Sequence, residues 1–121
     1  MTQRELLDFL LDIIEAIDEI ENFITGINFE EFANNREKIL AVIKLLGIIG
    51  EATKKIPEDL RDQYPEIPWR AVVGMGDVLV HQYWQVDVAV VWETVMESLP
   101  LLKGVIAEMI KRNQADGESI I

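Results

Sequence analysis

Apolar residues recur every three or four positions along most of this chain, a spacing that places them on one face of an α-helix. The first such stretch runs from Leu6 to Ile24. Thr2 can cap its start with Glu5 as capping-box partner, and Gly26 is placed to end it. We expect this stripe to face the core, with a dimer seam as the second interpretation. Its members are Leu6, Leu10, Ile13, Ile17, Ile20 and Ile24.

Two further helices follow, each preceded by an asparagine. Asn28 is placed to cap a short segment at 29–34. A second long helix is predicted over 37–56, with either Asn34 or Asn35 as its cap. Together these segments supply two more apolar faces.

The remaining chain continues the helical pattern. Gly47 and Gly50 lie inside the second long helix, where glycine costs about 1 kcal/mol relative to alanine, so we expect them to permit close backbone approach.

Asp87 is predicted to cap a helix over 88–98. Pro100 then either kinks that helix or starts a new one. The sequence therefore predicts an all-α fold, a bundle of four to five helices running up and down.

The helix predicted over Ile67–Tyr83 holds the single histidine of the protein, His81. Pro68 opens this helix, where the missing N–H costs nothing. Asp77 and His81 are four residues apart and therefore share one helix face. On the residues alone, His81 is most simply a structural histidine paired with Asp77, which favours the charged imidazole. Tyr83 is then a packing residue.

Composition narrows the class of protein. The 121 residues suit one domain, which we expect over 1–112, with a flexible C-terminal tail over 113–121. The chain has no cysteine and one histidine, so we expect no metal and no cofactor. No apolar run approaches the roughly 20 residues of a membrane span, and no signal peptide is apparent. We expect a cytoplasmic protein without a membrane partner.

The formal charge of −11 also bears on partners. Nucleic-acid binders usually carry a basic stripe, because releasing counterions from phosphates supplies much of their affinity. Basic residues here form only isolated pairs, at 54–55 and 111–112. The acidic balance counts against autonomous, tight RNA or DNA binding and is compatible with a basic partner surface.

Several segments resemble proteins of the HepT-like family, which belongs to the HEPN superfamily. The resemblance covers the chain from about Leu6 to Ile110. In the first half it rests on Glu15-Ala16-Ile17, Phe29-Glu30-Glu31-Phe32 and Ile48-Ile49-Gly50-Glu51-Ala52. In the second half it rests on Tyr64-Pro65-Glu66-Ile67-Pro68-Trp69-Arg70, His81-Gln82-Tyr83, Val86-Asp87 and Val91-Trp92-Glu93-Thr94-Val95.

The resemblance implies a small helical bundle that forms a homodimer and is encoded beside an MNT-type minimal nucleotidyltransferase. Many members of the family are ribonuclease toxins, and the nucleotidyltransferase is the antitoxin. In the family signature an arginine is followed by a histidine, any residue and a tyrosine. The histidine then corresponds to His81, a general acid or base in metal-independent RNA cleavage. Tyr83 is similar to the tyrosine that antitoxins modify with AMP.

This sequence departs from the family signature at the arginine. The expected position, directly after Met75, is Gly76, and its usual polar neighbour is Asp77. Arg70 lies eleven residues before His81, about 16 Å along a helix at 1.5 Å per residue, so it does not replace the missing arginine. We therefore expect weakened or lost ribonuclease activity. The alternative is a non-catalytic dimeric partner or substrate-binding subunit of the nucleotidyltransferase.

Overall fold

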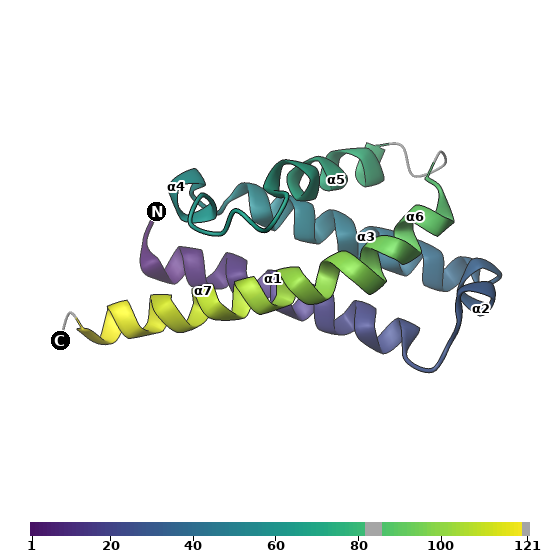
Figure 1. Ribbon diagram of the computed structural model, residues 1–121, viewed down its shortest axis with the longest axis horizontal. Coiled ribbons are helices and arrows are strands. Elements are labelled where there is room, and N and C mark those ends of the chain that lie inside the picture. The colour runs from purple at the N-terminus through teal and green to yellow at the C-terminus, as the bar shows by residue number, and fades with distance from the viewer. Residues whose placement is uncertain (82–85, 120–121) are drawn as a thin grey trace.

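In a computed structural model, described for residues 1–81 and 86–119 and without the side chains of 76–81 and 115–119, the chain is an all-α bundle. Long helices run up and down along one axis, and the N-terminus and the end of α7 lie at the end of the bundle opposite α2 (Figure 1). The predicted fold class is confirmed. The elements are α1 (Gln3–Ile24), α2 (Phe29–Ala33), α3 (Arg36–Lys54), α4 (Glu58–Arg61), α5 (Trp69–His81), α6 (Val88–Glu93), the π-helical segment η2 (Thr94–Ser98) and α7 (Leu99–Ser119).

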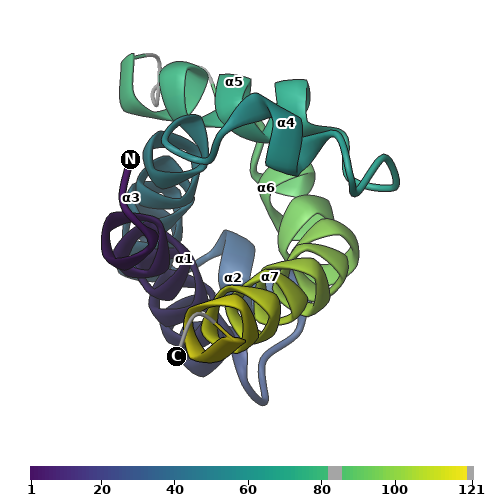
Figure 2. The same ribbon diagram turned by 90° about the vertical axis from the view of Figure 1, so that its left-hand side faces the viewer.

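Viewed along the bundle, α1, α3, α5 and the continuous α6–η2–α7 helix form four sides of a ring (Figure 2). Close packing joins α1 to α3, α3 to α5 and α1 to α7. The fourth seam, between α5 and α6–η2–α7, is much more sparsely packed. The bundle is therefore closed on three seams and open on the fourth.

Side-chain caps fix where the first helices begin. The Thr2 hydroxyl accepts a hydrogen bond from the Glu5 amide at 3.1 Å, as its position predicted. The Asn35 side chain accepts from the amide of Lys38 at 3.0 Å, which decides between the two predicted caps of α3. Asn28 caps α2 as predicted, and Gly26 ends the preceding turn with a positive φ of 79°. Each cap satisfies a backbone N–H that the helix leaves unpaired.

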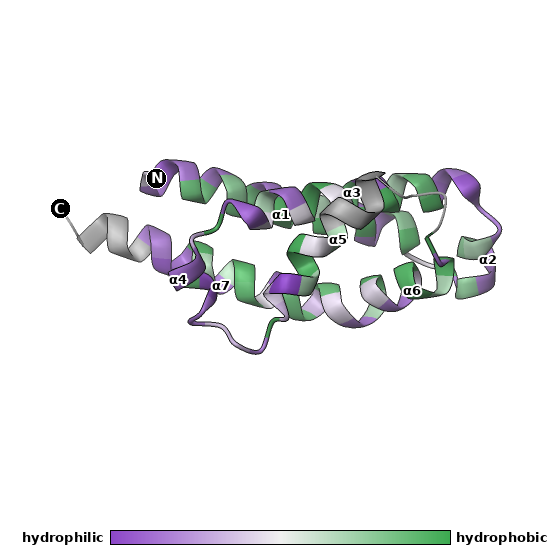
Figure 3. Ribbon diagram, turned by 90° about the horizontal axis from the view of Figure 1, so that it is seen from above, coloured by the Kyte–Doolittle hydropathy of each residue, from purple (hydrophilic) through white to green (hydrophobic). Residues whose placement is uncertain are grey.

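The apolar stripe of α1 faces the core, which confirms the first interpretation of that helix. Leu10, Ile13, Ile17 and Ile20 are fully buried, and their partners come from the inner faces of α3 and α7. Hydrophobic and hydrophilic residues alternate along the helices accordingly (Figure 3). Burial of each such side chain contributes about 1.5–3 kcal/mol. One continuous core therefore holds the long helices together.

Pro100 is the second residue of α7, in agreement with the prediction that it starts a new helix, and the π-helical segment η2 leads into it without a break. The Leu99 amide donates to the carbonyl of Thr94, five residues earlier. Proline has no N–H and its ring crowds the carbonyl of the preceding turn. The wider turn of η2 absorbs this defect, and the helix continues into α7.

The C-terminal helix extends beyond the predicted domain end. α7 continues to Ser119 and so includes most of the predicted tail, while the division at residue 112 stays a prediction. Among the described residues, no helix has the length and hydropathy needed to cross a membrane.

Candidate functional site

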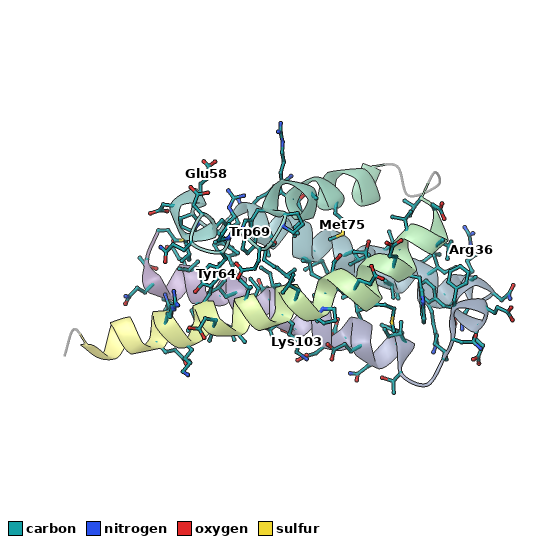
Figure 4. The ribbon with its side chains drawn as sticks, in the orientation of Figure 1. Arg36, Glu58, Tyr64, Trp69, Met75 and Lys103 are labelled. Carbon is teal, nitrogen blue, oxygen red and sulfur yellow. The ribbon has the colours of Figure 1, made fainter. Side chains whose placement is uncertain are left out.

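The helix that carries His81 is anchored at its start by a tryptophan. The Trp69 indole Nε1 donates a 2.9 Å hydrogen bond to the backbone carbonyl of Tyr64, and the two side chains lie together in Figure 4. Tyr64 is only 6% exposed, and Ile67 between them is 4% exposed. Trp69 is half-buried and packs against the core. The entry to α5 is therefore fixed by burial and by a directed hydrogen bond.

The structure places three of the predicted site positions on α5. Gly76, Asp77 and His81 all belong to this helix, and His81 is its last residue. Asp77 and His81 are thus one helical turn apart, and both are on the same face by register. Their side chains lie outside the described part of the chain, and Tyr83 lies outside the described residues altogether. The Asp77–His81 pairing stays a prediction.

The C-terminal end of α5 points towards the end of the bundle that carries α2 and the start of α6 (Figure 1). There Asp87 caps α6 as predicted, because its carboxylate accepts from the Ala89 amide at 2.9 Å. Trp92 packs on α2, with its ring centroid 5.2 Å from that of Phe32 and 6.1 Å from that of Phe29. This aromatic cluster fixes the chain just beyond the candidate site.

Two arginines in the described chain are relevant to a phosphate ligand. Arg70 is exposed in the first turn of α5, far from His81 along the helix, as the sequence indicated. Arg36, at the start of α3, lines a cavity of about 470 Å³ together with Val86 and Val88 (Figure 4). Arg36 was not predicted from the sequence, because its proximity to residues fifty positions later depends on the packing of α3. Neither arginine forms an ion pair within the described residues.

A larger cavity of about 680 Å³ occupies the open seam beside α5. Val72 and Met75 line it from α5, and Met75 points into it in Figure 4. Val90, Thr94 and Leu101 line it from the α6–η2–α7 helix. We call this cavity the α5 groove. Its lining is mainly apolar, so it favours hydrophobic contact over catalysis.

The described acidic residues do not converge on a metal-ligand arrangement. Within residues 1–81 and 86–119, as far as side chains are described, no group of three or more His, Asp or Glu side chains is close enough to hold a metal ion. The side chains of Asp77 and His81 lie outside the residues to which this statement applies.

Comparison with known proteins extends this description. A family model described as "Ribonuclease HepT-like" matches residues 13–109. The "Putative RNase MJ1216" of Methanocaldococcus jannaschii is 43% identical over 119 residues, which cover 98% of both chains. The "Probable ribonuclease HepT" of Thermococcus cleftensis is 50% identical over 102 residues, covering 84% of this chain and 93% of the relative. No solved structure gives a significant match.

Proposed function

From the premise that this chain belongs to the ribonuclease HepT-like family of the HEPN superfamily, we propose that it is a HepT-like toxin with a weakened, metal-independent endoribonuclease site at the end of α5. The observation that supports the proposal is the family match over residues 13–109, which includes all of α5 and its His81. The resemblance to the HepT-like family that the sequence indicated is thus confirmed.

His81 is the residue to which we assign the chemistry. An imidazole titrates near neutral pH, so it can take the proton of a ribose 2′-hydroxyl or give one to the leaving oxygen. Asp77 lies one turn earlier on the same helix, and a carboxylate paired with the imidazole would favour its protonated form. The predicted catalytic residues are thus His81, as general acid or base, and Asp77 beside it on the same helix.

Gly76 is the reason for proposing weak activity. A family arginine at this position would place a guanidinium near the phosphoryl oxygens, where charge develops in the transition state. Loss of one preorganised donor of this kind costs on the order of a hundredfold in rate. Asp77 adds a negative charge beside the vacant position, which repels phosphate further.

The proposed assembly is a homodimer that brings His81 of both copies to one cleft, together with an MNT-type nucleotidyltransferase as antitoxin. In this assembly Tyr83, two residues beyond His81, is the proposed AMP acceptor. A bulky, charged group at this position would obstruct access to His81, which gives modification a direct route to inhibition.

A second candidate function is that of a non-catalytic dimeric partner or substrate-binding subunit of the nucleotidyltransferase. Two observations favour it: the glycine at the arginine position and the net charge of −11, which opposes RNA binding. The presence of His81 favours the ribonuclease. Measurement of cleavage separates the two candidates.

The deciding experiment is cleavage of a mixed RNA pool by the purified protein and by its His81→Ala and Gly76→Arg variants. We expect slow cleavage by the parent, loss of cleavage with His81→Ala, and faster cleavage with Gly76→Arg by a factor on the order of a hundred. Arginine also has a higher helix propensity than glycine, so the variant helix is not weakened by its backbone.

Gly74→Arg is the matched control for Gly76→Arg. It adds the same charge to the same helix, but two residues away, at about 200° around the helix axis. A Cβ atom at Gly74 would meet no heavy atom within 4 Å, so the backbone itself leaves room for a side chain to start there. Equal activation by both variants would show a nonspecific charge effect. Silence of the parent and of Gly76→Arg would favour the partner-subunit function.

A further inference from the structure

The open seam between α5 and the α6–η2–α7 helix is sparsely packed within the part of the chain that the structure describes. In a four-helix bundle each long helix normally packs on two neighbours. Among the described residues, α5 packs closely on α3, and the α5 groove of about 680 Å³ lies on its other side. The groove therefore leaves apolar surface of both walls uncovered.

The side chains that line the α5 groove are strongly exposed, which bears on whether the groove binds a small molecule or a helix. Val90 is 57% exposed and Leu101 is 49% exposed, although both line the groove. A small ligand site usually buries about 70–90% of the ligand within a concave pocket. An open trough between two helices instead resembles the grooves that receive an amphipathic helix. The geometry therefore favours a helix over a small molecule.

The outer wall of the groove presents side chains at helical spacing. Val90, Thr94, Glu97 and Leu101 follow one another at intervals of four, three and four residues, and all line the groove. The π turn of η2 lies in the middle of this wall. Its wider backbone keeps Thr94 and Glu97 beside the groove while Val95 stays 4% exposed in the core. The wall is thus apolar at its two ends and polar at its centre.

The charged residues at the α5 groove favour a binding partner of opposite charge. Asp87 and Glu97 are the charged residues among the described lining, and both are exposed. Glu97 forms no ion pair within the described part of the chain. These two carboxylates give the α5 groove an acidic rim. Electrostatic attraction to these carboxylates would raise both the affinity and the association rate of a basic partner.

We propose that the α5 groove is the docking site for a basic amphipathic helix of a protein partner. Apolar residues of that helix at positions i, i+3, i+4 and i+7 fill the space between Met75, Val90 and Leu101. Lysine or arginine residues flanking this stripe pair with Asp87 and Glu97. This inference does not depend on ribonuclease activity, because it rests on the groove and not on His81.

The test uses a synthetic 14-residue peptide of leucine and lysine whose leucines follow this spacing. Binding to the full chain is measured by isothermal titration calorimetry, beside a peptide of the same composition in scrambled order. A leucine–glutamate peptide of the same pattern tests the charge. We expect the patterned basic peptide to bind at least about tenfold more tightly than the other two.

Variants of the lining residues test whether the peptide binds in the α5 groove. The Val90→Asn/Leu101→Asn double variant should weaken binding at least about tenfold, because it removes apolar contacts at both ends of the wall. Glu97→Gln should weaken binding severalfold and reduce its dependence on salt. The matched control is Leu11→Asn/Met96→Asn, since these residues are 45% and 50% exposed but lie outside the groove lining. All four positions are exposed, so the variants remain folded.

Three results would overturn the proposal. The first is equal binding of the scrambled peptide or no binding at all. The second is an equal loss of affinity in the control double variant. The third is dissociation of a dimer by Val90→Asn/Leu101→Asn in analytical ultracentrifugation, which would assign the groove to a second copy of the chain.

Discussion

The backbone N–H of Leu99 donates to the carbonyl of Thr94, and Pro100 follows directly. This five-residue hydrogen bond is the local response of the helix to a proline that cannot donate one. It also shapes the outer wall of the α5 groove, because Thr94 and Glu97 belong to the widened turn. Pro100 thus affects both the geometry of the helix and the shape of the surface proposed for partner docking.

Replacing Pro100 should stabilise the protein. Proline in a helix interior is about 3 kcal/mol less favourable than alanine, and the added freedom of the unfolded chain offsets up to about 1 kcal/mol. The π turn already relieves part of the cost, so we expect Pro100→Ala to raise the free energy of unfolding by about 1 kcal/mol. Urea denaturation measures this change. Pro68→Ala, just ahead of α5, is the control and should have a smaller effect; a larger gain there would contradict the interpretation.

The aromatic cluster at Trp92 should be stabilised unequally by its two phenylalanines. Phe32 is fully buried, whereas Phe29 is 39% exposed, although both rings contact Trp92. Phe32→Ala should therefore cost about 3–5 kcal/mol, the usual range for a buried aromatic. Phe29→Ala should cost clearly less. Thermal unfolding of both variants makes the comparison, and equal losses would show that ring contact outweighs burial.

Removing the hydroxyl of Tyr64 should leave stability unchanged or raise it. This oxygen is buried and has no hydrogen-bond partner among the described residues. Burial of an unpaired polar group costs about 1–3 kcal/mol, and Tyr64→Phe removes that cost while keeping the ring. The ring also keeps its contact with the Arg112 guanidinium, 5.4 Å from the centroid. A loss of more than about 1 kcal/mol in denaturant unfolding would reveal a hydrogen bond to the hydroxyl.

Lys103 should make stability depend on pH in the alkaline range. Its ammonium lies 2.9 Å from Asp18 and 3.1 Å from Glu21, which joins α7 to α1. Hydrogen bonds to Asp18 and then to Glu21 raise the pKa of Lys103 above its usual value of 10.5. A raised pKa in the folded state stabilises it below the unfolded pKa, and this contribution is lost as pH rises through the folded pKa.

The corresponding variant is Lys103→Met. Its melting temperature should fall below that of the parent at pH 8, and the difference should shrink above pH 11 and in high salt. Lys44→Met is the control, because Lys44 is exposed and forms no ion pair within the described residues. A difference that persists unchanged above pH 11 would assign the effect to packing of the lysine stem.

Much of the fold could be predicted from local patterns. The stripe from Leu10 to Ile20 repeats at helical spacing and is buried as predicted, because a helix can hide an apolar face only against other helices. Thr2, Asn28 and Asp87 cap their helices as predicted, since a cap depends on only three or four neighbouring residues. These features need no long-range information.

The surroundings of the candidate site depend on tertiary packing. His81 and Asp77 were placed on one helix face by their spacing alone, and α5 contains both. The cavity shared by Arg36 and Val86, and the open seam between α5 and α6–η2–α7, could not be inferred in this way. The sequence by itself determined the helices, their caps and the position of the single histidine. Only the tertiary structure decided which helices meet and which seam stays open, because packing sums many weak contacts between residues distant in the chain.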